Sequence, residues 1–123
     1  MKYNFKDWIV GESDDYVVIN KPPYISSLED RHTSFNILAA AKSLYDDPQL
    51  CHRLDKETSG ILVIAKNPEA YRNLAMQFEA REVDKVYHAV VSGIHDIDGV
   101  LIDAPLYTGA SGKVRVSFSK GKP

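Results

Sequence analysis

The strongest constraint on the fold of this chain is a run of five apolar residues at positions 61–65, Ile-Leu-Val-Ile-Ala. A short apolar run that is rich in β-branched residues and follows a Thr-Ser-Gly turn is typical of a buried strand. Because no polar residue alternates with the apolar ones, the pattern predicts burial on both faces of that strand. The rest of the chain therefore has to supply a sheet and the layers that cover it.

Two segments before this run have recognisable patterns. Residues 16–20 are apolar and β-branched, which predicts a short strand, and the Lys-Pro-Pro sequence at 21–23 ends it because proline has no backbone N–H to donate. A helix is predicted from Thr33 or Ser34, either of which can cap it, to about Tyr45, since apolar residues recur there at helical spacing.

The segment after the run predicts a second helix. It begins with Asn67-Pro68, an N-cap residue followed by the amino acid favoured at the first helical position. A helix that packs on the sheet by one face is then predicted by four apolar residues at positions i, i+3, i+4 and i+7: Tyr71, Leu74, Ala75 and Phe78.

Toward the C-terminus the pattern returns to strands. Residues 86–91 predict a strand that a Ser-Gly pair ends, and residues 99–102 and 114–118 are expected to pair across a Gly-rich turn at 109–112. Strands and helices thus occur in mixed order with a hairpin near the end. This order favours an α+β fold over a regular parallel array of β-α-β units.

Length and composition bound the class of protein. The chain has 123 residues, 44 % of them hydrophobic, which suits one domain at most. No stretch approaches the roughly 20 apolar residues of a membrane span, and the N-terminus lacks the apolar run of a secretion signal. These features predict a cytoplasmic protein, and the single cysteine, Cys51, agrees with a reducing compartment.

The net charge of −2 argues against indiscriminate binding of nucleic acid, because domains that bind in this way are usually basic. The charge is uneven along the chain, however. Residues 1–50 hold five Lys and Arg against eight Asp and Glu, whereas residues 51–123 hold ten against nine. A local basic surface that contacts nucleic acid is therefore compatible with the composition.

The loop before the apolar run carries the most chemistry, in the sequence Cys-His-Arg-Leu-Asp-Lys-Glu-Thr-Ser-Gly at 51–60. It places a carboxylate, Asp55, two residues from a guanidinium, Arg53. Polar residues at the end of a rigid strand are a common plan for an active site. The alternative is a surface ion pair in a connecting loop, which contributes about 0–1 kcal/mol.

This loop and the strand after it resemble the signature of the RluA-type pseudouridine synthases, which isomerise uridine in RNA. Two other segments resemble the same family. Val-Ile-Asn-Lys-Pro-Pro at 18–23 is similar to its opening strand and Lys-Pro turn, and Lys-Val-Tyr at 85–87 to its second motif, a Lys-x-Tyr at the start of a strand. The resemblance implies a mixed, largely antiparallel sheet with helices outside, and a substrate in ribosomal or transfer RNA.

The resemblance also implies roles for individual residues. Asp55 is the essential carboxylate, either as a nucleophile at the sugar or as the base that opens a glycal route, and Arg53 is expected to keep it ionised. Tyr87 is a candidate to remove the proton from carbon 5 of uracil. Arg53 also helps to hold the uridine flipped out, with His52 and Lys85 as further RNA contacts. Neither a metal nor a cofactor is needed, because the substrate contains every atom of the product.

The resemblance covers residues 16–123 as the N-terminal portion of the catalytic domain, with residues 1–15 as a lead-in. A basic Arg-Thr-His-Gln-Ile-Arg type segment of the family, which supplies a counter-charge to the carboxylate, has no equivalent here. We therefore expect a fragment that is incomplete at its C-terminus and has little activity alone. Its unpaired strand edges are expected to allow self-association.

Two other functions stay open at this point. One is a non-catalytic RNA-binding or assembly module with the same fold, and the other is a carboxylate-dependent glycosidase or nucleosidase, for which Glu57 is the nearest second carboxylate. Other sites fail on inspection. Cys51 and His52 are adjacent, so in an extended segment their side chains point to opposite sides. The four histidines lack metal-ligand spacing, and the turn at 109–112 lacks the context of a phosphate-binding loop.

Overall fold

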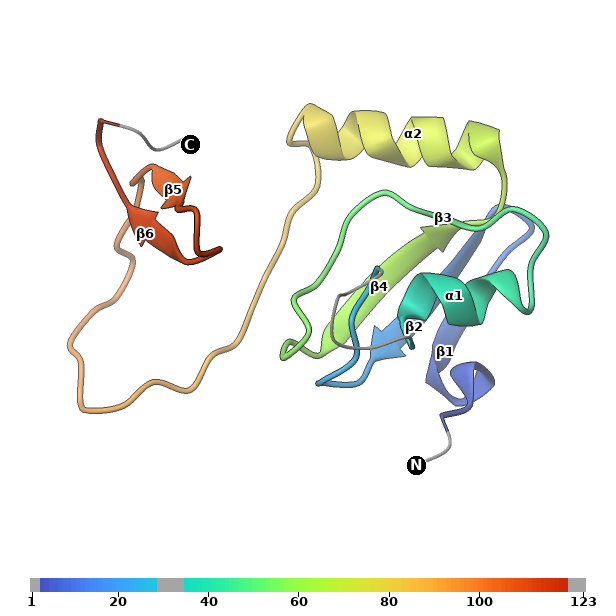
Figure 1. Cartoon of the computed structure of the whole chain (residues 1–123), viewed down its shortest axis with the longest axis horizontal. Coiled ribbons are helices and arrows are strands. Elements are labelled where there is room, and N and C mark those ends of the chain that lie inside the picture. Colours follow the sequence, from blue (N-terminus) through green and yellow to red (C-terminus); the bar gives the residue numbers. More distant parts are fainter. Residues whose placement is uncertain (1–2, 29–34, 120–123) are drawn as a thin grey trace. The chain divides into compact units, whose positions relative to one another are not determined.

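The computed structural model describes residues 3–28 and 35–119, which belong to two compact units, Met1–Val86 and Tyr87–Pro123. Figure 1 labels the helices and strands of each unit and colours them along the sequence. Within those residues the first unit holds a four-stranded sheet, a 3-10 helix and two α-helices, and the second holds a two-stranded hairpin.

The sheet of the first unit has the strand order β1-β2-β4-β3, and every neighbouring pair is antiparallel. Its strands are β1 (Ile9–Glu12), β2 (Tyr16–Lys21), β3 (Gln49–Leu50) and β4 (Gly60–Ala65). The predicted α+β class with a largely antiparallel sheet is thereby confirmed. In the longest pairing, Lys21 at the end of β2 lies opposite Gly60 at the start of β4, so the turn after β2 is close to the loop that enters β4.

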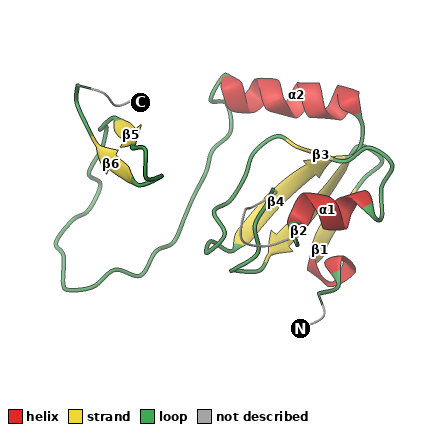
Figure 2. Cartoon of the chain, in the orientation of Figure 1, coloured by secondary structure: helices red, strands yellow, loops and turns green. Residues whose placement is uncertain are grey.

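The hydrophobic core lies on one face of this sheet. Because side chains alternate along a strand, Val17 and Ile19 of β2 share this face with Leu62 and Ile64 of β4, and all four are fully buried. Helix α1 (Ile37–Lys42) lies across these strands (Figure 2) and buries two residues against them, and the 3-10 helix η1 (Phe5–Trp8) adds one more: Ile37, Ala41 and Phe5.

The opposite face of the sheet is only partly covered. Ile61 of β4 is 56 % exposed and Val63 is half-buried, so the prediction that this strand is buried on both faces is wrong. Helix α2 (Pro68–Glu79) lies beside β3 and β4 and buries Ala70, while the rest of its apolar stripe is half-buried. The covering layer on this face is one partly packed helix, and an apolar run alone does not reveal that.

The two helices begin with the same kind of cap. As predicted, Asn67 caps α2: its Oδ1 accepts the Ala70 N–H at 2.8 Å, and Pro68 follows. Helix α1 is shorter than predicted, because Asn36 caps it by accepting the Ala39 N–H at 2.8 Å. The predicted caps, Thr33 and Ser34, lie outside the described residues. At the other end, residues 43–45 continue the chain with turn hydrogen bonds to the last helical carbonyls.

Residues before β2 form more structure than a lead-in. Asn4 accepts the Lys6 N–H at 3.2 Å and starts η1, and β1 then pairs with β2 from Ile9 opposite Ile19 to Glu12 opposite Val17. The first strand of the sheet therefore comes from the segment that was expected only to precede the fold.

The second unit confirms one C-terminal prediction and corrects two. β5 (Leu106–Thr108) and β6 (Val114–Val116) pair across the predicted turn at 109–112. The partner of β6 is 106–108 and not 99–102, and residues 86–91 form no strand. Residues with strand-type sequence need a partner strand, and none pairs with 86–102 within the described residues. Nine large apolar side chains there are exposed: Val86, Tyr87, Val90, Val91, Ile94, Ile97, Val100, Leu101 and Ile102.

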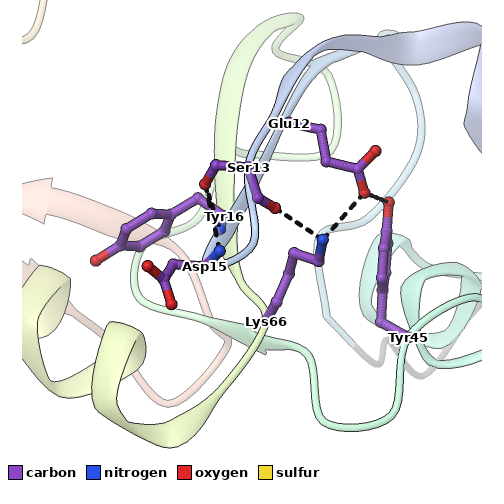
Figure 3. A network of polar contacts seen from close by, with 6 residues as sticks. All are labelled: Glu12, Ser13, Asp15, Tyr16, Tyr45 and Lys66. Atoms are coloured by element: carbon purple, nitrogen blue, oxygen red, sulfur yellow. Dashed lines mark hydrogen bonds and ion pairs between the residues drawn. The ribbon is translucent and has the colours of Figure 1, made fainter.

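A polar network fixes the C-terminal end of β4 (Figure 3). Lys66 Nζ donates to the Ser13 carbonyl at 2.8 Å and pairs with Glu12 Oε1 at 3.3 Å, and the Tyr45 hydroxyl donates to the same Glu12 oxygen at 2.7 Å. Burial, together with the bond to Glu12, raises the pKa of Tyr45 to about 12. The network joins the β1–β2 turn, the segment after α1 and the connection from β4 to α2.

The Asn67 cap yields a stability prediction. Asn67→Ala is expected to lower the free energy of unfolding by about 1 kcal/mol, because the Ala70 N–H loses its acceptor. Asn67→Ser is the matched control: its hydroxyl can cap the helix but cannot replace the Asn67 Nδ2 bond to Asp15 at 2.9 Å. Urea unfolding followed by Trp8 fluorescence measures both variants. Equal losses would show that the bond to Asp15, and not the cap, carries the stabilisation.

Candidate active-site loop

The loop between β3 and β4, residues 51–59, carries the carboxylate singled out by the sequence and is called the Asp55 loop below. The side chains of Arg53 and Asp55 are both exposed. A turn follows the carboxylate, in which the Thr58 N–H donates to the Asp55 carbonyl at 3.0 Å. The backbone around Asp55 is held by hydrogen bonds from the end of β2 and from the segment after it.

Ser27 holds the residue before the carboxylate. Its hydroxyl donates to the Leu54 carbonyl at 2.8 Å and accepts the Leu54 N–H at 3.3 Å, so one side chain satisfies both backbone groups. Ser27 is buried, and the Leu54 side chain belongs to the hydrophobic core. Leu54 is therefore fixed both by packing and by hydrogen bonds.

Lys21 and Tyr24 hold the residue after the carboxylate. The Lys56 carbonyl accepts the Tyr24 N–H at 2.6 Å and Lys21 Nζ at 3.2 Å. Lys21 is fully buried, and its ammonium also donates to the carbonyls of Pro22 at 2.9 Å and Ile25 at 2.8 Å. Burial lowers the pKa of Lys21, and the nearby carboxylates partly oppose this shift.

These contacts place an exposed carboxylate on a backbone that is fixed on both sides. Sites that act on a substrate depend on such support, because a reactive group has to be held close to its productive position. A connecting loop has no need of a buried ammonium and a buried hydroxyl directed at its carbonyls.

His52 attaches the start of the Asp55 loop to β4 and α2. Its Nε2 accepts the Val63 N–H at 3.0 Å, and its ring stacks on Phe78 with centroids 4.5 Å apart and an interplanar angle of 15°. Lys85 Nζ lies 5.5 Å from the centroid of the same Phe78 ring. His52 and Lys85 thus both lie against Phe78, which the sequence pattern placed only on the apolar stripe of a helix.

Within the described part of the chain, no ion pair joins Arg53 and Asp55, so the surface ion pair that was the alternative is not formed. The expected effect of Arg53 on the carboxylate stays a prediction. A thiol–imidazole pair is absent for a physical reason. Burial raises the pKa of Cys51, and the acceptor nitrogen of His52 is already bonded to Val63.

Tyr87 lies in the second unit, where its side chain is exposed. Its proximity to Asp55 stays a prediction, as does its role. Among the described residues, no group of three or more His, Cys, Asp or Glu side chains is placed to hold a metal ion. None of the helices within 3–28 and 35–119 has the length and apolar character needed to cross a membrane.

Comparison with known proteins identifies the family. The family model described as RNA pseudouridylate synthase matches residues 15–120. The chain belongs to this family, as its resemblance to the RluA-type signature predicted.

Several relatives illustrate the match. The chain is 33 % identical to ribosomal large subunit pseudouridine synthase C of Vibrio cholerae, over 94 % of this chain and 38 % of that protein. It is 36 % identical to dual-specificity RNA pseudouridine synthase RluA of Vibrio vulnificus, over 94 % of this chain and 48 % of that protein. The solved structure of human RNA pseudouridylate synthase domain containing 4 is 30 % identical and superposes with a TM-score of 0.53, covering 63 % of this chain and 31 % of its own. The chain therefore spans less than half the length of these proteins.

The bond between His52 and β4 predicts a dependence of stability on pH. Burial, and secondarily Lys85, lowers the pKa of His52 from its ordinary 6.5. Above pH 6.5 the His52 ring is neutral in both the folded and the unfolded state, so the neutral ring contributes its full stabilisation of the fold. This stabilisation is lost as the pH falls through the lowered pKa of the folded state, because the unfolded state binds the proton more readily.

Urea unfolding at neutral and mildly acidic pH measures this effect. His52→Gln, whose amide oxygen can accept the Val63 N–H but does not titrate, is expected to show a smaller loss of stability on acidification. An identical pH dependence in both proteins would assign the loss to other groups.

The clamp on Leu54 can be tested with a matched pair of serines. Ser27→Ala is expected to lower the free energy of unfolding by about 2 kcal/mol, because two backbone groups of Leu54 lose their buried partner. The exposed hydroxyl of Ser43 donates to the Ala40 carbonyl at 2.6 Å. Ser43→Ala should therefore change the free energy of unfolding by no more than about 0.5 kcal/mol. Amide exchange at Leu54 should also become faster only in the first variant. Similar stability of the two variants would argue against the clamp.

Proposed function

We propose that this protein takes part in the isomerisation of uridine to pseudouridine in ribosomal or transfer RNA, with Asp55 as the essential carboxylate. The observation that carries this proposal is the geometry of the Asp55 loop: the carboxylate is exposed to a substrate while its backbone neighbours, Leu54 and Lys56, are held by buried groups. Membership of the RNA pseudouridylate synthase family supports the choice of reaction.

The reaction defines what the carboxylate has to do. The bond between uracil nitrogen 1 and the sugar breaks, the base rotates, carbon 5 joins the same sugar carbon, and the proton on carbon 5 leaves. Asp55 acts either as the nucleophile at the sugar or as the base that removes a sugar proton on a glycal route. Tyr87 is our candidate for the group that takes the carbon 5 proton.

RNA contacts are proposed for two residues of this loop, Arg53 and His52, and for Lys85. Arg53 is exposed one residue before the buried Leu54, where its guanidinium can hold the flipped uridine or a phosphate. Lys85 is exposed next to Phe78 and can contact a phosphate. His52 already uses Nε2 to accept the Val63 N–H, which leaves its Nδ1–H to meet RNA.

We also infer that this polypeptide is a fragment with little turnover of its own. Two of its relatives are about twice as long or longer, since the chain spans 48 % of one and 38 % of the other. The nine large apolar side chains exposed at 86–102 support the same inference, because folded proteins rarely expose large apolar patches. Self-association through strand edges stays a prediction.

Replacing the carboxylate tests the proposed reaction. In a protein extended by its natural continuation, Asp55→Asn is expected to lower pseudouridine formation in ribosomal and transfer RNA transcripts by roughly a thousandfold or more, because an amide can act neither as nucleophile nor as base. Glu57→Gln is the matched control, since Glu57 is an exposed carboxylate two residues away. It should keep activity within about threefold.

Mass spectrometry of nuclease-digested RNA measures the product. An active Asp55→Asn variant would contradict the assignment of Asp55 as the essential carboxylate. Equal losses in both variants would instead show that the reaction depends on two carboxylates, Asp55 and Glu57. The 123-residue chain, assayed beside the extended protein, tests the inference that it is a fragment.

A further inference from the structure

Tyr24 combines an unfavourable backbone conformation with an exposed aromatic ring. Its φ is +69°, in the left-handed region that bulky residues rarely adopt, and its side chain is 71 % exposed. Burial of the ring therefore does not account for the conformation.

The other non-glycine residue with a positive φ among those described, Arg81, has an ordinary explanation. It follows the last turn of α2, where the Arg81 N–H donates to Phe78 at 3.1 Å and the Glu82 N–H to Gln77 at 2.9 Å. These two bonds are the Schellman motif that ends many helices. Tyr24 ends no helix.

Tyr24 occupies a turn position that suits a different amino acid. Pro23 before it fixes φ near −65°, and a positive φ at the next residue is the pattern of a type II turn, in which glycine or asparagine is favoured. Either residue would remove the strain. The chain nevertheless has tyrosine there.

The turn is held rigidly next to the Asp55 loop. The Tyr24 N–H donates to the Lys56 carbonyl at 2.6 Å, and the Lys21 ammonium binds the carbonyls of Pro22 and Ile25 as well as that of Lys56. The backbone of Tyr24 is therefore one hydrogen bond from the residue that follows Asp55. A strained backbone conformation persists only where the surrounding structure holds it, and such residues are frequent at functional sites.

We propose that Tyr24 is an RNA-contacting residue of this site, whose ring stacks on a base next to the uridine that Asp55 acts on. This inference rests on the proposed function and names a substrate contact for it. Flipping one uridine out of the RNA exposes the face of its neighbour, and an exposed aromatic ring binds such a face whatever the base. Stacking also requires no charge, which suits a chain with a net charge of −2.

Three substitutions separate the ring from the strain. Tyr24→Phe keeps both, whereas Tyr24→Asn and Tyr24→Gly relieve the strain and remove the ring. If the ring serves RNA, Tyr24→Asn should unfold at the same or a higher urea concentration than the wild type and yet bind RNA about tenfold more weakly. Tyr24→Phe should match the wild type in both measurements. If Tyr24 were purely structural, Tyr24→Asn would not keep its stability and at the same time bind RNA more weakly.

The probe is a fluorescein-labelled RNA stem-loop with a uridine-rich loop, and fluorescence anisotropy gives the dissociation constants for the full chain. Because stacking releases no counterions, the ratio between Tyr24→Asn and wild type should stay constant as salt rises from about 50 to 200 mM. A ratio that shrinks toward one with salt would identify an electrostatic contact and overturn the stacking proposal. So would a wild type that does not bind the stem-loop, or a Tyr24→Phe variant as weak as Tyr24→Asn.

Pseudouridine formation by the extended protein on the same RNA separates this inference from the proposed function. If Tyr24→Asn forms pseudouridine with the same KM as the wild type, the role of Tyr24 is overturned while the proposed reaction is supported. Binding that depends on the Tyr24 ring, without any pseudouridine, would support the contact and overturn the reaction.

Discussion

The buried ammonium of Lys21 is the interaction on which the candidate site depends. A charge removed from water is costly unless it is fully hydrogen-bonded, and here three carbonyls surround it, from Pro22, Ile25 and Lys56. Two of these carbonyls belong to the turn after β2 and the third to the Asp55 loop. The cost of burying the charge is thus offset only when the turn and the loop are both in place, so the two segments order each other.

β4 connects two polar systems of different character. At its end, Lys66 and Glu12 meet near Tyr45 in an exposed network that joins elements at the edge of the fold. At its start, the groups that hold the Asp55 loop are buried and directed at backbone carbonyls. Exposed ion pairs contribute little to stability, whereas buried hydrogen bonds are expensive to break. The end of β4 that follows the Asp55 loop is therefore the one held by buried groups.

Sequence patterns predicted what local interactions decide. The strand at 61–65 and the Asn67 cap of α2 were predictable because apolar runs and cap residues act through their immediate neighbours. The strand at 86–91 was predicted wrongly, since β-branched residues indicate a strand only where a partner exists. The contacts of Ser27 and Phe78 follow from tertiary packing and leave no pattern, and Tyr24 stands where local rules favour glycine or asparagine.

The hydrogen bond from Val63 to His52 has a consequence for how the sheet ends. β3 stops at Leu50 opposite Ile64, so Val63 is next in register, and an imidazole nitrogen takes the place of a strand carbonyl there. A strand edge recruits another chain by presenting a repeated row of N–H and C=O groups, and a single ring breaks that row. His52, which anchors the Asp55 loop, therefore also blocks this part of the β4 edge. A strand from another chain would have to displace the stacked rings of His52 and Phe78 before it could pair there.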